Sequence, residues 1–220
     1  MGLSFARKYG DLPKENRVNN LKCLLLILVF SIPSLSFAYG LGYASYPLQE
    51  KQLLLSPEFV GLFSNGAGAG IQGRVTFKPN QPFVVDGGFG VGTGDRPVRI
   101  FTGVDYEIFP DYDNQPRVSV KGSYEYAREF KQGINIIGAA PTISKGFLFW
   151  WHKAYPYFAI PFALGLHDAT KTYQSRLNMT AGIAGNIPLQ GQGHLIGNAE
   201  MTVSLKDGYG GFLFSVAYPL

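Results

Sequence analysis

The sequence predicts an all-β protein that closes into a small antiparallel, up-and-down barrel crossing a membrane. Three observations support this fold: polar and apolar residues alternate along ten segments, glycine (28 residues) and aromatic residues (15%) are abundant, and only 15% of residues are charged. Soluble domains carry about 25% charged residues. After the N-terminal region no apolar run reaches the roughly 18 residues of a membrane helix, so a membrane form has to cross with strands.

Residues 1–38 are predicted to be a secretory signal peptide with a long polar N-terminal part. Lys22 precedes the apolar core Cys23–Phe30, and Pro33 and small residues follow up to Ala38. A basic flank, an apolar core and a small final residue are typical of a signal peptide, here cleaved after Ala38. The alternative is a short buried helix or a membrane anchor, but the core is too short for a comfortable span.

Two details of this region limit what the processed chain contains. The polar stretch before Val18 is long for a signal peptide, which suggests the hypothesis that translation starts at Val18. Cys23, the one cysteine, lies at the start of the apolar core, whereas a lipid-bearing cysteine would lie at its end. The processed chain therefore has no cysteine and no disulfide.

The positive charge of the chain is concentrated at its N-terminus. The formal net charge is +4, from 19 basic and 15 acidic residues. Five of the basic residues and two of the acidic ones lie in residues 1–38, which leaves 14 basic against 13 acidic residues. No basic block or interleaving of basic and aromatic residues follows, so nucleic-acid binding is not predicted.

Ten segments after residue 53 show the period of two that is typical of strands. In Val98–Ile108, for example, Val98, Ile100 and Val104 share one face, and Arg99 and Asp105 share the other. Glycine, asparagine, aspartate and proline between the segments predict turns. We expect ten strands, with eight as the alternative, since an even number is usual in single-chain bacterial barrels. The expected strands are 54–64, 71–77, 83–91, 98–108, 117–126, 132–144, 157–166, 176–183, 195–205 and 209–220.

In the clearest segments all the charged side chains fall on one face. A soluble sandwich with this face in water is the alternative. We favour a barrel that encloses the charges, because its apolar face can meet lipid, where a midplane Lys or Arg costs about 2–4 kcal/mol. The basic members Arg99, Arg117, Lys121 and Arg176 are expected to pair with Asp105, Glu107, Glu125 and Glu200. The predicted charged lumen comprises Arg74, Asp86, Arg99, Asp105, Glu107, Arg117, Lys121, Glu125, Arg176 and Glu200.

The C-terminus predicts a closing strand. Its alternate apolar positions are Phe212, Phe214, Val216, Tyr218 and Leu220. This pattern resembles the closing strand and assembly signal of bacterial outer-membrane β-barrel proteins, and the chain after Ala38 resembles the small OmpA-like and OmpX-like barrels. Members of that class usually end in phenylalanine, whereas this chain ends in leucine after Pro219.

The resemblance implies a place in the bacterial outer membrane, among outer-membrane lipids and lipopolysaccharide. It also implies barrel-assembly machinery and periplasmic chaperones as partners during biogenesis. Residues 39–52 are expected to form a short periplasmic lead before a barrel of residues 53–220, and the length of the chain leaves no room for a plug domain. The sequence does not indicate an oligomeric state.

A barrel of eight to ten strands is narrow enough for side chains to fill. We therefore expect a non-catalytic outer-membrane protein with a charge-paired lumen and a structural or surface role. The alternatives are a narrow pore for small solutes and a lipid-modifying barrel enzyme. For an enzyme only His152, His167 and His194 are available, and none lies two positions from a serine. No metal-ligand spacing or phosphate-binding loop is present, so no metal, cofactor or catalytic site is predicted.

Overall fold

The computed structural model describes residues 40–63, 68–94, 96–130, 132–149, 152–189 and 191–220. Contacts divide the chain into two units, Met1–Pro33 and Ser34–Leu220. The predicted signal peptide and its cleavage site at Ala38 lie outside the described residues. The described ranges contain no helix, and hence none long and apolar enough to cross a membrane.

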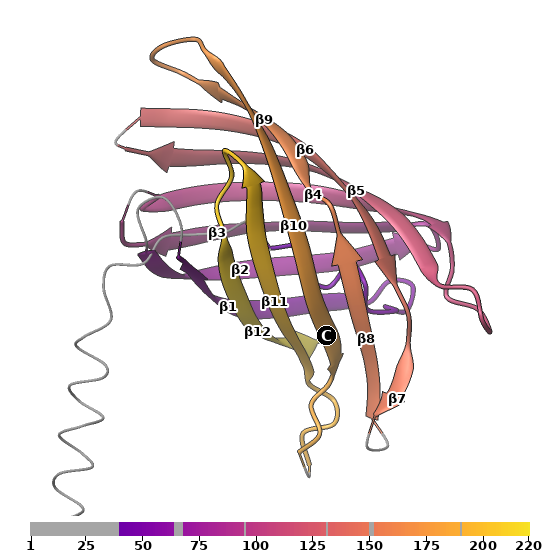
Figure 1. Ribbon diagram of the computed structural model, residues 1–220. Coiled ribbons are helices and arrows are strands. Elements are labelled where there is room, and N and C mark those ends of the chain that lie inside the picture. Colours follow the sequence, from indigo (N-terminus) through magenta and orange to yellow (C-terminus); the bar gives the residue numbers. More distant parts are fainter. Residues whose placement is uncertain (1–39, 64–67, 95, 131, 150–151, 190) are drawn as a thin grey trace, which may run out of the picture. The chain divides into compact units, whose positions relative to one another are not determined.

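The second unit is built from antiparallel strands (Figure 1). They are β1 (Leu53–Leu62), β2 (Gly68–Asn80), β3 (Phe83–Gly92), β4 (Val98–Phe109), β5 (Arg117–Glu129), β6 (Gln132–Ser144), β7 (Phe147–Phe149), β8 (His152–Ala159), β9 (Phe162–His167), β10 (Tyr173–Asn186), β11 (Ile196–Lys206) and β12 (Gly211–Pro219).

These strands form a closed barrel with ten strand positions around its wall, because β8 and β9 share one position and β7 pairs with β8. Strands β1 to β6 pair in chain order, β6 and β10 both pair with β8 and with β9, and β10, β11 and β12 pair in turn. Closure comes from β12 and β1, whose register runs from Leu54 opposite Pro219 to Leu62 opposite Gly211. The expectation of ten strands is confirmed, and the eight-stranded and sandwich alternatives are wrong.

Strands β8 and β9 together take the place of one barrel strand, which is interrupted at Ile160 and Pro161. Pro161 has no amide hydrogen to donate, which explains a break in the ladder there. The neighbouring backbone still bridges the gap, because the Ile160 amide donates to the Pro141 carbonyl and the Asn178 amide donates to the Pro161 carbonyl. The short β7 pairs only with β8 among the described residues and extends the hairpin after β6.

The two faces of the strands differ as the alternation predicts. On β4, Arg99 and Asp105 are buried, whereas Ile100 and Val104 are 55% and 44% exposed. Of the predicted apolar positions at the C-terminus, Phe214, Val216 and Tyr218 on β12 and Leu220 after it are exposed, and Phe212 is partly exposed. The outer wall is therefore apolar and the interior charged, the reverse of the usual arrangement in a water-soluble protein.

The barrel has two ends that matter for the site. We call the end where β1 begins and β12 finishes the near end, since Leu54 and Pro219 are paired there. The far end holds the connections β1–β2, β3–β4, β5–β6, β9–β10 and β11–β12.

Candidate functional site: the charged barrel interior

Charged side chains fill the interior in three groups along the barrel. The near-end cluster comprises Asp105, Glu107 and Arg117. The central network comprises Glu58, Arg74, Asp86, Lys121 and Glu200. The far-end cluster comprises Arg96, Arg99, Glu125, Glu129 and Arg176. Apart from Glu107, whose side chain is 18% exposed, all of these residues are buried.

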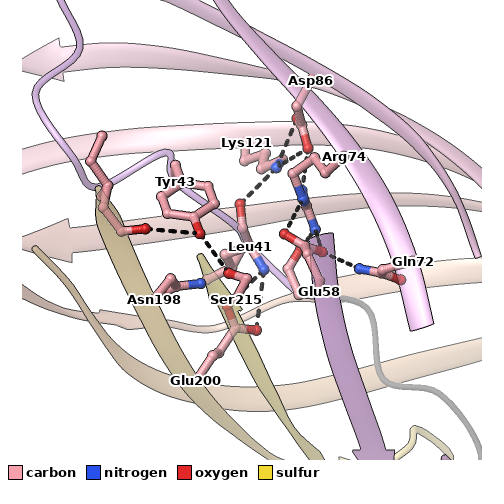
Figure 2. A network of polar contacts seen from close by, with 12 residues as sticks. Leu41, Tyr43, Glu58, Gln72, Arg74, Asp86, Lys121, Asn198, Glu200 and Ser215 are labelled. Atoms are coloured by element: carbon pink, nitrogen blue, oxygen red, sulfur yellow. Dashed lines mark hydrogen bonds and ion pairs between the residues drawn. The ribbon is translucent and has the colours of Figure 1, made fainter. Parts of the chain in front are cut away.

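Arg74 is the hub of the central network (Figure 2). Its Nε lies 2.9 Å from Glu58 Oε1, and its Nη1 donates to Asp86 Oδ2. Lys121 Nζ lies 2.8 Å from Asp86 Oδ1, so Asp86 bridges two cations. Burying such charges is tolerable only when they are paired and hydrogen-bonded, and this geometry supplies both.

Strand register and a missing side chain bring these groups together. Asp86 on β3 lies opposite Gly103 on β4. A Cβ at Gly103 would lie 2.7 Å from Asp86 Oδ1 and 2.7 Å from Lys121 Cε. Glycine at position 103 therefore leaves the space in which the Lys121 side chain reaches Asp86.

The far-end cluster occupies the part of the lumen away from the near end. Arg176 Nη1 and Nη2 donate to the two oxygens of Glu129 at 2.9 and 2.8 Å. Arg96 enters from the β3–β4 connection, where its Nη2 lies 2.8 Å from Glu125 Oε1. The guanidinium carbons of Arg96 and Arg176 lie 5.1 and 5.5 Å from the centroid of the Tyr209 ring. Together with Arg99, three cations, two acids and one aromatic ring thus occupy this end.

The near-end cluster is centred on Arg117. Its Nη2 lies 2.5 Å from Asp105 Oδ2, its Nε lies 2.7 Å from Glu107 Oε2, and its Nη1 donates to Ser119 Oγ at 2.8 Å. These contacts link β4 and β5, which are neighbours in the barrel.

The chain before β1 also lies inside the barrel. We call Gly40–Leu48 the lead segment, in which every residue except Tyr46 and Pro47 is buried. Leu41 packs with Ala140, Tyr157 and Ala159. The expectation of a short periplasmic lead at residues 39–52 therefore needs correction for Gly40–Leu48, which occupies the lumen.

The lead segment is fixed largely by main-chain contacts. Arg74 Nη2 donates to the Gly40 carbonyl at 2.9 Å, and Lys121 Nζ donates to the Leu41 carbonyl at 2.8 Å. The Leu41 amide lies 3.1 and 2.9 Å from the two oxygens of Glu200. The Tyr43 hydroxyl lies 2.7 Å from Ser215 Oγ, and burial raises the pKa of Tyr43 well above its ordinary value.

The space left beside the far-end cluster is small. A cavity of about 60 Å³ lies there and is lined by Arg96, Glu125 and Arg176 among others. It holds a few water molecules at most. A larger hollow, about 1620 Å³, is lined mainly by apolar residues, including the outward-facing Phe59 and Ile71, and so belongs mainly to the outer wall.

Comparisons with known proteins give matches to solved structures at low identity and low TM-score. No protein-family model and no curated protein matches the sequence. Among solved structures, the KdgM porin matches at 14% identity with a TM-score of 0.32, over 76% of this chain and 98% of the porin chain. Ail, the attachment invasion locus protein of Yersinia pestis, matches at 12% identity with a TM-score of 0.29, over 78% of this chain and 100% of Ail.

The structure pairs the predicted lumen residues in part differently from the expectation. Arg99 contacts Glu125, and Arg117 contacts both Asp105 and Glu107. The partners of the other two cations differ, because Lys121 pairs with Asp86 and Arg176 pairs with Glu129. Glu200 accepts hydrogen bonds from Tyr157 and Leu41 instead of pairing with a predicted cation.

Sequence reasoning missed four charged residues that the structure buries, Glu58, Lys78, Arg96 and Glu129. Glu129 lies on the same face as Glu125, and a longer estimate of this strand would have included it. Glu58 lies in a segment where proline obscures the alternation. Arg96 lies in a connection, where no periodicity indicates the direction of its side chain.

The three histidines do not assemble a catalytic arrangement among the described residues. His167 Nε2 lies 3.5 Å from Gln174 Oε1, and the His194 ring lies edge-on to Tyr218. His152 is the first residue of β8. In the same ranges, no group of three histidine, cysteine or acidic residues is placed to hold a metal ion.

Proposed function

We propose that this protein is exported and spans a bacterial outer membrane as a closed, non-catalytic barrel with a structural or surface role. The polarity of its walls supports this location. Ionised side chains are enclosed, and the outward positions carry exposed apolar side chains such as Ile71, Ile137 and Leu164. Such a wall suits hydrocarbon, and closure removes the strand edges that hydrocarbon cannot satisfy.

The main support for a closed barrel is the position of the lead segment inside a lumen whose charged side chains form ion pairs. Arg74 and Lys121 hold its carbonyls while they also hold Glu58 and Asp86. A solute path along the axis would have to displace the lead segment and break these ion pairs. The central network therefore holds the lead segment in place and does not line a channel.

Outer-membrane lipids and lipopolysaccharide are the surroundings that this outer wall fits. We expect assembly by barrel-assembly machinery with periplasmic chaperones, which would act on the apolar C-terminal strand β12. Its exposed side chains Phe214, Val216 and Tyr218 lie on the strand that closes the barrel against β1.

Two measurements test the proposal. The full chain, expressed in a Gram-negative host, should fractionate with lipopolysaccharide and migrate differently on a gel before and after boiling. In planar bilayers the purified protein should be electrically silent. Discrete, reproducible conductance steps would instead assign the narrow pore, and recovery as a detergent-free soluble monomer would rule out the membrane barrel.

A further inference from the structure

The outer wall of the barrel is hollowed on one side. The hollow of about 1620 Å³ is lined by residues of β1, β2, β3, β11 and β12, and by residues of β7, β8 and β10. Its volume exceeds the about 300–1,000 Å³ of a usual small-molecule pocket. Its bulky side chains include Phe59, Ile71, Phe89 and Phe214, which are 43–65% exposed. The hollow is therefore large and apolar enough for long hydrocarbon chains.

Glycines on the outer face contribute to the floor of this hollow. Gly73 on β2 follows Gln72 and precedes Arg74, both of which are buried, so position 73 faces outward. A Cβ at Gly73 would have nothing within 4 Å. Gly87 on β3 faces outward in the same way, because it follows the buried Asp86. Both glycines line the hollow, which is deeper at these positions because no side chain covers the backbone.

A second hollow adjoins the first toward the far end of the barrel. It measures about 420 Å³ and is lined by Phe63 and Phe212 among others. Ala199 and Phe214 line both hollows. We call the two hollows together the lateral groove.

A positive charge lies at the edge of the lateral groove. Lys153, near the start of β8, lines the groove and is exposed, and His152 lies beside it in the chain. Neither residue forms an ion pair within the ranges that the structure describes. Among the described residues that line the larger hollow, the one acid is Glu58, which is buried and paired with Arg74. A cation beside an apolar groove suits a ligand with an anionic headgroup and hydrocarbon chains.

We propose that the lateral groove binds one anionic phospholipid, with its acyl chains over Gly73 and Gly87 and its phosphate beside Lys153. This inference rests on the proposed membrane location and deepens it, because it distinguishes one bound lipid from the bulk lipid around the rest of the wall. The lipid would fill a concavity that other side chains leave open, and its headgroup would supply the negative charge that Lys153 lacks.

A second copy of the chain suits the lateral groove less well. In a two-fold symmetric dimer the same surface of both copies is in contact. The groove of one barrel would then face the groove of the other, and two hollows placed face to face leave empty space between them. Flexible acyl chains can follow an irregular concave surface, which favours lipid as the occupant.

The test is native mass spectrometry of the full chain, purified from membranes in detergent. The protein is titrated with phosphatidylglycerol and, separately, with phosphatidylcholine that has the same acyl chains. Gly73→Leu fills the groove at a position where the added side chain meets nothing. The matched control is Gly122→Leu on β5, an exposed glycine outside the groove, where a Cβ would have only the Val104 carbonyl oxygen within 4 Å, at 3.9 Å. Lys153→Gln removes the charge.

We expect the natural chain to bind one phosphatidylglycerol roughly five-fold more tightly than phosphatidylcholine, the contribution of about one lysine near the membrane surface. Gly73→Leu should weaken the binding of both lipids by roughly ten-fold or more, because its side chain takes the place of buried hydrocarbon. Lys153→Gln should abolish the preference for phosphatidylglycerol, and Gly122→Leu should change neither affinity.

Three results would overturn the inference. They are unchanged lipid binding in Gly73→Leu, equal affinity of the natural chain for the two lipids, and a natural dimer that Gly73→Leu dissociates. Heat-modifiability establishes that each variant is folded. A barrel that fractionates with the outer membrane but binds no phosphatidylglycerol would keep the proposed function and lose the lipid site, so the two failures are distinguishable.

Discussion

Arg176 and Glu129 meet as a two-pronged pair across the far end of the barrel. Both terminal nitrogens of the guanidinium donate to the carboxylate, at 2.9 and 2.8 Å, from β10 to β5. Strands β6 and β9 lie between β5 and β10 in the sheet. The pair therefore spans part of the lumen and does not merely reinforce neighbouring strands.

Replacing this arginine by lysine should not be neutral. Lysine keeps the charge but offers a point-like ammonium that cannot reproduce two parallel bonds. We expect Arg176→Lys to lower the free energy of unfolding by about 1–2 kcal/mol, and Arg176→Ala by about 3–5 kcal/mol because it leaves Glu129 with one cation fewer in a buried site. Urea unfolding in detergent micelles measures both. Equal losses for the two variants would contradict a role for the paired geometry.

Loss of Arg74 should be the most damaging single change in the central network. Arg74→Ala removes a cation shared by Glu58 and Asp86 and also releases the Gly40 carbonyl. We expect a loss of about 3–5 kcal/mol in the free energy of unfolding. The control is Lys145→Ala, which breaks the partly exposed pair with Asp111 and should cost less than about 1 kcal/mol.

The proposed lipid-facing wall predicts a dependence on depth. Val104 lies in the middle of β4 and Ile108 near its end, and both are exposed outward. Arginine in a lipid-facing position costs about 2–4 kcal/mol at the midplane and about 0–1 kcal/mol near the interface. Val104→Arg should therefore reduce the yield of heat-modifiable protein in the membrane much more than Ile108→Arg. If water covered this wall, both variants would assemble equally well.

Gly42 tests how tightly the lead segment fits. Its φ is +71°, and a Cβ there would lie 2.7 Å from Arg74 Nη1. Gly191 has a similar φ of +80° but nothing within 4 Å of the corresponding position. Alanine should cost about 1–2 kcal/mol at either position through the backbone alone, and overpacking against Arg74 should add about 1–3 kcal/mol at Gly42. Thermal unfolding of Gly42→Ala and Gly191→Ala separates the two contributions. Equal unfolding temperatures for the two variants would show that the lead segment shifts to make room for the added methyl group.

Much of the fold could be predicted from the sequence because membrane-barrel strands show their two faces in the residue types. On β4 the inward residues Arg99, Gly103 and Asp105 alternate with mostly apolar outward residues, so the strand and its inward face could both be predicted. The interrupted strand formed by β8 and β9 was harder to predict, because proline and small residues hide the alternation near Pro156 and Pro161.

The lead segment could not be predicted for a different reason. Residues such as Leu41, Tyr43 and Leu48 show no period, and they fill space left by inward side chains of many strands. Pairings across the lumen depend on barrel twist and side-chain length. The sequence therefore indicated that Lys121 and Arg176 point inward but not that they would reach Asp86 and Glu129.

The fastening of the lead segment has a consequence for how the sequence can diverge. Arg74, Lys121 and Glu200 hold the backbone atoms of Gly40 and Leu41, which every amino acid except proline provides. Related chains can therefore exchange the side chain at position 41 for another of similar bulk and keep all of these bonds. The number of residues between position 41 and β1 has no such freedom, because adding or removing one shifts each carbonyl away from its cation. Length, more than identity, should be the inherited property of this stretch.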